Sequence, residues 1–272
     1  MKTLVLANQK GGVGKSAVAT LLAHHFAQRG QRVLAIDFDH QGNFSKPLQM
    51  SERPAVAKCT ADALMTGSVF ALPSKPFVLV PSDRALLGLE RQPAMHTPFA
   101  RSFRAFLASV DAQFDVCVID TNPNPDIRLI AALASADFVL SPIQLNQEAM
   151  DGVHGLLNHD RVGVRKIKAV LIPKLQLIGL LPTMVEPAPF QKANFVQVIQ
   201  QYRPLMIQVG AGAGEFAFVP RRSAIAEAQA SGAVLWEMKK TAARDAWKEI
   251  EPGIARIAAI VNAQEKTHAP AA

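Results

Sequence analysis

A glycine-rich loop near the N-terminus constrains this chain more than any other feature. The stretch "KGGVGKS", residues 10–16, follows a short apolar run, "MKTLVLA", that is rich in strand-forming residues. After it comes "AVATLLAHHFAQRG", in which apolar side chains recur at helical spacing as far as Gly30. Strand, loop and helix in this order form an anion site, because backbone N–H groups and the helix N-terminus point at the same place. The alternative is a glycine-rich turn that carries two solvated lysines.

The residues of this loop have separate predicted roles. We expect Lys15 to reach the nucleotide phosphates and the Ser16 hydroxyl to bind Mg²⁺. The predicted nucleotide-binding residues of the loop are Gly11, Gly12, Val13, Gly14, Lys15, Ser16 and Ala17. The general phosphate-loop pattern places glycine at position 9, where this chain has Gln9, followed by a second lysine, Lys10. The loop therefore has the deviant form of the pattern.

Two further apolar runs end in acidic residues. "QRVLAIDFDHQGN", residues 31–43, ends in Asp37 and Asp39, and "FDVCVIDTNPN", residues 114–124, delivers Asp120 as a Walker B strand does. Ligands of open parallel α/β sheets bind at the carboxyl ends of the strands, so these carboxylates are expected near the loop. They are suited to ordering Mg²⁺ with its waters and positioning an attacking water. For Asp37 and Asp39 the alternative is helix capping or a turn.

In this order and spacing, "KGGVGKS", "IDFDHQGN" and "VIDTNP" resemble the ParA/MinD family of deviant Walker ATPases. The resemblance extends over nearly the whole chain, and the opening and the late stretch "KKTAARDAWKEI" are most similar to plasmid partition ATPases of the IncC type. Further stretches that resemble the family are "FVLVPS" (77–82), "ADFVLSPIQLNQEAMDGV" (136–153), "LIGLLPTMV" (177–185) and "FVPRRSAIAEAQASGAVLW" (218–236).

The resemblance implies roles that the residues alone do not fix. Two subunits would close face to face over two ATP molecules, with Lys10 crossing to the partner's phosphates as a catalytic group beside Lys15. Asp39 would orient the hydrolytic water. Ser16, Asp37 and Asp120 would form the Mg²⁺ site. Pro220 would lie next to the adenine.

The chain departs from the family pattern at two positions. His40 stands where the family usually has proline, and Asn122 replaces a small residue or proline after the Walker B strand. We interpret His40 as a neutral surface substitution rather than a new base. Because the segment around Asn122 responds to the γ-phosphate in relatives, we expect slow or differently gated hydrolysis. Neither change removes a ligand.

The alternation of strands and helices predicts a single α/β domain over residues 1–264, followed by a disordered tail at 265–272. Its fold class is a mostly parallel twisted sheet flanked by helices on both faces, a P-loop NTPase of the deviant Walker A type. Only two cysteines are present, Cys59 and Cys117, and Cys117 lies inside the Walker B strand, which indicates a core residue rather than a disulfide or zinc ligand.

The basic character of the chain favours an anionic partner. Its net charge is +7 and its pI is about 9.6. The predicted residues for binding non-specific double-stranded DNA are Arg221, Arg222, Lys239, Lys240 and Arg244. The alternatives are a solvated basic surface and a second basic group, which comprises Arg161, Arg165, Lys166 and Lys168.

These observations favour a cytoplasmic, nucleoid-associated partition ATPase whose ATP-bound homodimer binds DNA and is released when a ParB-type centromere-binding protein stimulates hydrolysis. We expect no membrane contact, and no separate DNA-reading domain ahead of a loop that starts at residue 10. Three alternatives stay open. A MinD-like membrane cycle would use the C-terminal apolar stripe around Ile254 and Ile257. A metabolic ATP-dependent enzyme would need a second polar pocket, and an ATPase that positions another cargo would share the same module.

Overall fold

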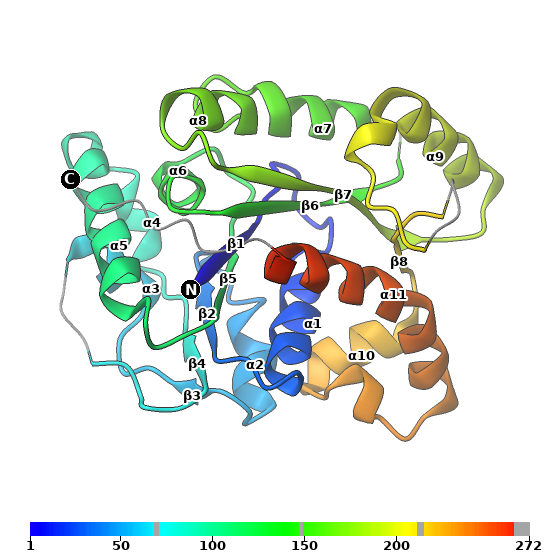
Figure 1. The fold of residues 1–272 in the computed structure, drawn as a ribbon, viewed down its shortest axis with the longest axis horizontal. Coiled ribbons are helices and arrows are strands. Elements are labelled where there is room, and N and C mark those ends of the chain that lie inside the picture. Colours follow the sequence, from blue (N-terminus) through cyan, green and yellow to red (C-terminus); the bar gives the residue numbers. More distant parts are fainter. Residues whose placement is uncertain (68–70, 147–148, 211–214, 264–272) are drawn as a thin grey trace.

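A computed structural model gives the fold and describes residues 1–67, 71–146, 149–210 and 215–263. It contains one eight-stranded sheet with the strand order β3-β4-β2-β5-β1-β6-β7-β8 (Figure 1). Every pair of neighbouring strands in this sheet is parallel. The strands are β1 (Lys2–Leu6), β2 (Val33–Asp37), β3 (Ala55–Val56), β4 (Phe77–Val80), β5 (Val116–Asp120), β6 (Phe138–Gln144), β7 (Gln176–Val185) and β8 (Val219–Pro220).

Helices cover both faces of the sheet, as parallel sheets require because their connections cross over the faces. On one face lie α1 (Lys15–Gln28), α2 (Ser45–Met50), α10 (Ser223–Ser231) and α11 (Thr241–Ala263). On the other face lie α3 (Ala61–Thr66), α4 (Leu86–Leu89), α5 (His96–Val110), α6 (Ile127–Leu133), α7 (Ala149–Asn158), α8 (Val164–Val170) and α9 (Pro189–Tyr202). Short 3₁₀ turns occur at η1 (Pro93–Met95), η2 (Arg203–Leu205) and η3 (Leu235–Glu237).

The central strands are buried on both faces, which explains why they read as continuous apolar runs. In β1, Leu4 and Leu6 pack into the core under α1, whereas Val5 packs into the core on the opposite face. The period of two along a strand sends successive side chains to opposite faces. The predicted Walker B strand behaves in the same way: Cys117 is fully buried, and burial raises the pKa of its thiol.

The register of β2, β5 and β1 brings the predicted site together. Asp37 at the end of β2 is the register partner of Asp120 at the end of β5, and Asp120 is also the partner of Leu6 at the end of β1. The glycine loop follows β1 directly. Three segments that are far apart in the sequence therefore meet at one edge of the sheet, as Figure 1 shows for β1, β2 and β5.

The C-terminal apolar stripe belongs to the core. Ile254 and Ile257 on α11 are 1% and 0% exposed and pack with side chains of α1 and β1. The stripe is therefore a packing surface of the core in this structure. Among the described helices, none has the length and apolar character needed to cross a bilayer. The predicted tail at 265–272 lies outside the described residues, and the domain boundary stays a prediction.

Candidate nucleotide-binding site

The backbone of the glycine loop has the conformation that the sequence predicted. Gly12 and Gly14 have φ values of 73° and 79°, which favour glycine. A Cβ added at Gly11 or Gly12 would meet nothing within 4 Å, so this part of the exposed loop faces open space. Gly14 caps the N-terminus of α1. Open space that faces backbone N–H groups at a helix N-terminus fits a phosphate group.

Lys15 points back into this loop. Its side chain is buried, and Nζ donates to the carbonyl oxygens of Asn8 and Lys10, each at 3.1 Å. Burial lowers the pKa of Lys15, while the carboxylates of Asp120 and Asp39 raise it. Among the described residues its hydrogen bonds are to carbonyl oxygens, one of which a phosphate oxygen could replace. The predicted role of Lys15 agrees with this geometry.

Ser16 and Asp120 form the polar centre of the site. The Ser16 hydroxyl donates to Asp120 Oδ2 at 2.6 Å. Asp120 is fully buried, and its second oxygen, Oδ1, has no hydrogen-bond partner among the described residues. Burial and the neighbouring Asp37 raise the pKa of Asp120 well above its usual range, against the opposing effects of Ser16 and Lys15. A buried carboxylate oxygen without a partner is costly, and a hydrated Mg²⁺ would supply what it lacks.

Asp37 has a different position from the one expected of a metal ligand. Its Oδ2 accepts from the backbone N–H and the hydroxyl of Ser45, at 2.8 and 2.6 Å, and its Oδ1 accepts from Asp39 N at 2.9 Å. Both oxygens therefore fix the loop that follows β2. Burial raises the pKa of Asp37 to about 6. Its proposed contribution to a Mg²⁺ site is indirect, through the placement of Asp39 and the charge that it adds beside Asp120.

The protein side chains do not enclose a metal by themselves. In the described ranges, no group of three or more His, Cys, Asp or Glu side chains is arranged to hold a metal ion. A Mg²⁺ ion that keeps several waters and binds phosphate oxygens needs only one or two carboxylates and a hydroxyl. The pair of Ser16 and Asp120 meets that requirement.

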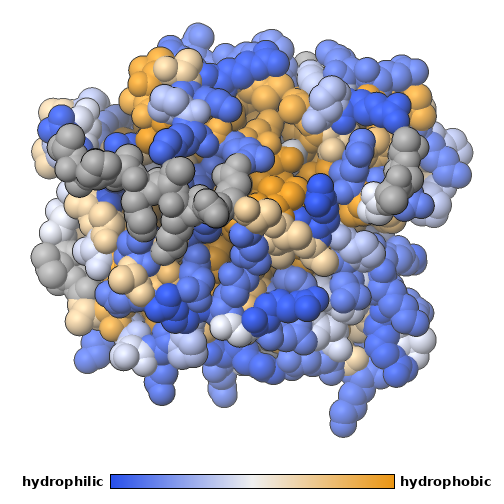
Figure 2. Space-filling view, viewed as in Figure 1, coloured by the Kyte–Doolittle hydropathy of each residue, from blue (hydrophilic) through white to orange (hydrophobic). Residues whose placement is uncertain are grey.

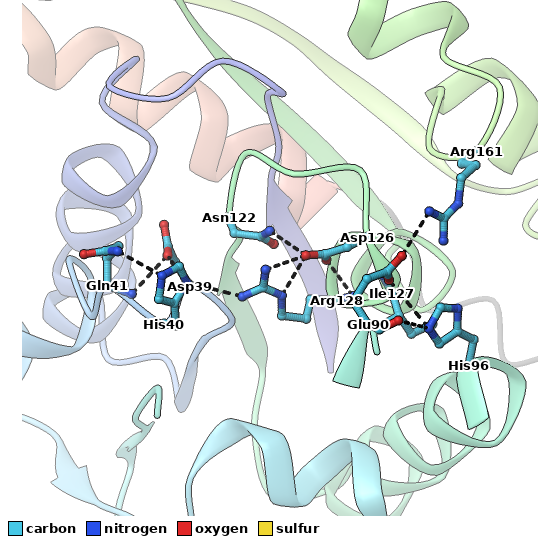
Figure 3. A network of polar contacts seen from close by, with 10 residues as sticks. All are labelled: Asp39, His40, Gln41, Glu90, His96, Asn122, Asp126, Ile127, Arg128 and Arg161. Carbon is cyan, nitrogen blue, oxygen red and sulfur yellow. Dashed lines mark hydrogen bonds and ion pairs between the residues drawn. The ribbon is translucent and has the colours of Figure 1, made fainter. Parts of the chain in front are cut away.

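Asp39 and His40 lie together in the loop after β2 (Figure 3). Asp39 is 7% exposed, and its Oδ1 accepts from Gln41 N at 3.1 Å. The His40 side chain is 23% exposed, and its Nδ1 lies 3.4 Å from the same Asp39 oxygen. The interpretation of His40 as a neutral surface substitution therefore needs correction, because the side chain is half-buried against the predicted water-positioning carboxylate.

The second departure, Asn122, is fully buried. Its side-chain amide donates to Asp126 Oδ2 at 2.9 Å. Asp126 also caps α6 by accepting from Arg128 N and forms an ion pair with the Arg128 guanidinium. Asn122 therefore fixes the loop after β5 to the start of α6 rather than entering the phosphate site.

Lys10 contributes its backbone to the loop. Lys10 N donates to Asn8 Oδ1 at 2.8 Å, and its carbonyl oxygen accepts from Lys15. The side chain is half-buried. Its role across a dimer interface stays a prediction, as does the placement of Pro220 beside an adenine at the end of β8.

Two residues of the site were not predicted from the sequence. Asn8 is buried, and its side-chain amide donates to the carbonyl oxygen of Pro142 at 2.8 Å. Its Oδ1 accepts a hydrogen bond from Lys10 N, so Asn8 ties the loop to β6. The Thr183 hydroxyl lies 2.8 Å from the carbonyl oxygen of Val13 and ties the loop to β7. The only signal for either was its position, Asn8 directly before the loop and Thr183 within a stretch that resembles the family.

The predicted DNA-binding residues are all exposed; they lie just before α10, just before α11 and, for Arg244, within α11. Three of the five are paired with carboxylates: Arg221 with Glu186 at 3.2 Å, Arg222 with Glu249, and Lys240 with Glu227. The surface over α10 and the start of α11 is largely hydrophilic (Figure 2). The five basic side chains thus lie in one region, and the paired glutamates lower the net positive charge of that region.

The fold and this loop define a nucleotide-binding protein of the P-loop class. A family model described as an AAA domain matches residues 1–177. Protein IncC of Escherichia coli is 37% identical over 265 residues, which cover 92% of this chain and 67% of that protein. The chromosome-partitioning ATPase Soj of Thermus thermophilus is 32% identical and covers 85% of this chain and 86% of its own length. The chain belongs to the ParA/MinD family of deviant Walker ATPases.

Solved structures agree with this assignment. The ATP complex of a Cyanothece McdA variant superposes with a TM-score of 0.74 at 21% identity and covers 99% of each chain, which supports the fold. Cobyrinic acid a,c-diamide synthase of Mycobacterium smegmatis, with a bound ATP analogue and magnesium, has a TM-score of 0.67 at 25% identity. It covers 86% of this chain and 91% of its own.

Proposed function

We propose that this protein is a DNA-partition ATPase in which ATP binding and hydrolysis determine when the protein is attached to DNA. One observation carries the proposal: the buried Lys15, the Ser16–Asp120 pair and the Asp120 oxygen that has no partner among the described residues lie together at the N-terminus of α1, beside the exposed glycine loop. This arrangement suits a nucleotide triphosphate with Mg²⁺. Asp39, whose carboxylate is close enough to raise the pKa of Lys15, would orient the attacking water.

ATP and Mg²⁺ are the cofactors that this site fits best. The loop amides and Lys15 would hold the phosphates, and Ser16 with Asp120 would hold the metal with its waters. Related structures with ATP, or with an ATP analogue and magnesium, support this choice. We expect hydrolysis to be slow until a partner stimulates it.

The proposed active form is a homodimer. Lys10 lies in the same loop as Lys15, and its side chain would place a second positive charge on the partner subunit's phosphates. ATP binding and dimer formation then become one event. The joined dimer would bind nucleoid DNA without sequence preference through the basic residues around α10 and α11, and a ParB-type protein would trigger release.

Light scattering with ATP, ADP or no nucleotide tests the dimer step. The wild-type protein is expected to dimerise only with ATP. Lys15→Ala is expected to lose nucleotide binding, whereas Lys10→Ala is expected to bind ATP yet remain monomeric. Lys46→Ala, in which an exposed lysine of α2 is removed, is the control that keeps both properties. ATP-dependent dimers of Lys10→Ala would contradict the interface role.

A metabolic ATP-dependent enzyme is the other candidate with structural support. A polar cleft of about 600 Å³ lies beside the loop after β2, and its lining includes Lys46, Ser82 and Arg84. Such a cleft meets the need for a second substrate pocket. We favour partition because the relatives at 32–37% identity over most of the chain are IncC and Soj. If the protein binds DNA in none of the nucleotide states, the metabolic ATP-dependent enzyme becomes the favoured function.

A further inference from the structure

A cavity of about 380 Å³ lies at the edge of the sheet opposite the nucleotide site, and its size is typical of small-molecule pockets. Its lining includes Phe77, which begins β4 and is the register partner of Val33, the first residue of β2. The cavity is therefore at the amino ends of these strands. The last turns of α1 form another wall, through His24 and Ala27. His24 follows Lys15 by nine residues, about 14 Å along the helix, so the two sites are separate.

Aromatic rings form much of the lining. Phe77 is 6% exposed, and its ring meets the His24 ring edge-to-face at a centroid distance of 5.9 Å. Trp236, in η3, packs on Trp247 of α11 at a centroid distance of 4.3 Å. These contacts hold the rings in place, so the walls of the cavity are already formed. Aromatic walls favour a flat aromatic molecule.

The charged side chains that line the cavity, Arg53 and Glu237, form an ion pair with each other. Gln31, another lining residue, is engaged as well, because its Nε2 donates to Asn262 Oδ1 at 3.1 Å. The two charges offset each other, so the lining does not favour a charged ligand.

Two ring nitrogens of the lining residues have no partner. Nε2 of His24 and Nε1 of Trp236 are buried and make no hydrogen bond with the described residues. Burial lowers the pKa of His24 to about 4, so the imidazole is uncharged at neutral pH. An indole N–H only donates, whereas a neutral imidazole offers one donor and one acceptor. Leaving such groups unpaired is costly, and an uncharged ligand with a polar edge would pair them.

We propose that this cavity binds a small, uncharged aromatic molecule whose polar edge carries a hydrogen-bond acceptor for Trp236 and a polar group for His24. An aromatic amide is a simple member of this class, because its carbonyl oxygen accepts and its nitrogen donates. The ring of the ligand packs against the aromatic walls. The inference does not depend on the proposed function in DNA partition, since it uses no residue of the nucleotide site.

The indole N–H signals in a ¹H–¹⁵N NMR spectrum test the proposal, because the chain has only two tryptophans, Trp236 and Trp247. The Trp236 signal is assigned by its loss in Trp236→Phe. Benzamide is the probe, and its expected Kd is on the order of 1 mM for a molecule of this size. It is expected to shift the Trp236 signal downfield, as a new hydrogen bond does. A Trp236 signal that benzamide leaves unmoved would overturn the proposal.

A comparison of benzamide with toluene tests the polar edge, because toluene has a methyl group in place of the amide. His24→Leu is expected to weaken benzamide binding about five-fold, the effect of one lost hydrogen bond. The same variant is expected to leave toluene binding unchanged. Equal changes for the two probes would mean that apolar surface alone binds them, which would contradict the proposed chemistry.

Ala27→Phe tests the location, because a larger side chain at this lining position is expected to fill the cavity. Its Trp236 signal is then expected not to respond to benzamide. The matched control is Arg29→Phe, at an exposed neighbouring position outside the lining, which is expected to keep the response. A full response in Ala27→Phe would place the probe elsewhere and refute the site.

Lys15→Ala separates this cavity from the nucleotide site. The variant is expected to lose nucleotide binding and to bind benzamide as the wild type does. Loss of benzamide binding in Lys15→Ala would mean that the probe occupies the nucleotide site, and the proposed cavity site would be rejected.

Discussion

Asp39 carries the proposed chemistry at the scale of single residues. It is held by its own loop: Asp39 N donates a hydrogen bond to Asp37 Oδ1, and Asp39 Oδ1 accepts one from Gln41 N. Its Oδ1 accepts a hydrogen bond from the protein, and its Oδ2 makes none with the described residues. This division of roles is what a water-positioning carboxylate requires.

We expect Asp39→Ala to slow ATP hydrolysis by about 100-fold or more, because general-base and water-orienting groups contribute about 10²–10⁴-fold. ATP binding is expected to persist, since Lys15 and Ser16 are untouched, so the variant accumulates as an ATP-bound dimer. Single-turnover hydrolysis and gel filtration with ATP measure the two properties. Asp83→Ala, which removes an exposed acid from the loop after β4, is the control. Rapid turnover in Asp39→Ala would reject the assignment.

The sequence predicted the residues whose chemistry follows from a local motif. Lys15, Ser16 and Asp120 each end or follow a strand in a recognisable pattern, and parallel register then brings them together. Asn8 and Thr183 could not be predicted in this way, because their partners lie more than a hundred residues away in the chain. The surroundings of His40 were missed because Arg128, 88 residues away in the chain, approaches it only in the folded protein.

At the scale of secondary structure, α1 joins the nucleotide site to the core. It begins at the phosphate loop with Lys15 and is buried along most of its length. His24 lies near its far end, 6% exposed, with its ring edge-to-face against Phe77 at a centroid distance of 5.9 Å. His24 Nε2 is buried and has no hydrogen-bond partner among the described residues.

Burial, with a smaller effect of Arg53, lowers the pKa of His24 to about 4. The unfolded chain binds this proton at about pH 6.5, so the folded state binds fewer protons between those values and loses stability as the pH falls. The loss is about 3 kcal/mol in all, of which about 2 kcal/mol occurs by pH 5.

The free energy of unfolding of His24→Leu is therefore expected to fall less than that of the wild type between pH 7.5 and pH 5. Denaturant titration at several pH values measures the difference. His154→Leu, at an exposed position of α7, serves as the control and is expected to keep the wild-type slope. If the free energy of unfolding of His24→Leu depends on pH as strongly as that of the wild type, protonation of His24 does not contribute to the loss of stability in acid.

The elements themselves were largely predictable from periodicity. The helix that starts at the glycine loop and runs toward Gly30 was expected, and the structure places α1 at Lys15–Gln28. The pairing between elements was not predictable. Two ion pairs depend on how α10 packs against α11. Arg222, just before α10, pairs with Glu249 on α11, and Lys240, just before α11, pairs with Glu227 on α10.

At the scale of the whole molecule, the proposed binding of DNA depends on the net charge of the protein surface. The chain has a net charge of +7, yet several cations of the predicted DNA surface are paired with glutamates. Exposed ion pairs of this kind are weak, so DNA phosphates can compete for the cations. A dimer would present two such surfaces, and binding by both would be much tighter than binding by one.

Charge reversal on this surface is expected to weaken DNA binding and spare ATP. Lys239→Glu and Arg244→Glu together are expected to lower affinity at least ten-fold and to reduce the salt dependence, because fewer counterions are released. Lys58→Glu and Lys75→Glu together, at exposed sites after β3 and before β4, are the control for net charge. Equal losses in both proteins would place the DNA surface elsewhere, for example around Arg165, Lys166 and Lys168.

ATP is proposed to convert the whole molecule from a weak DNA binder into a strong one, and this conversion is the central claim. The most direct test is binding to a duplex of arbitrary sequence with ATP, ADP or no nucleotide across a salt series, measured by fluorescence anisotropy. We predict tight, salt-sensitive binding with ATP alone and its loss in Lys10→Ala. Binding that is absent, or that is equal in all three nucleotide states, would contradict the claim.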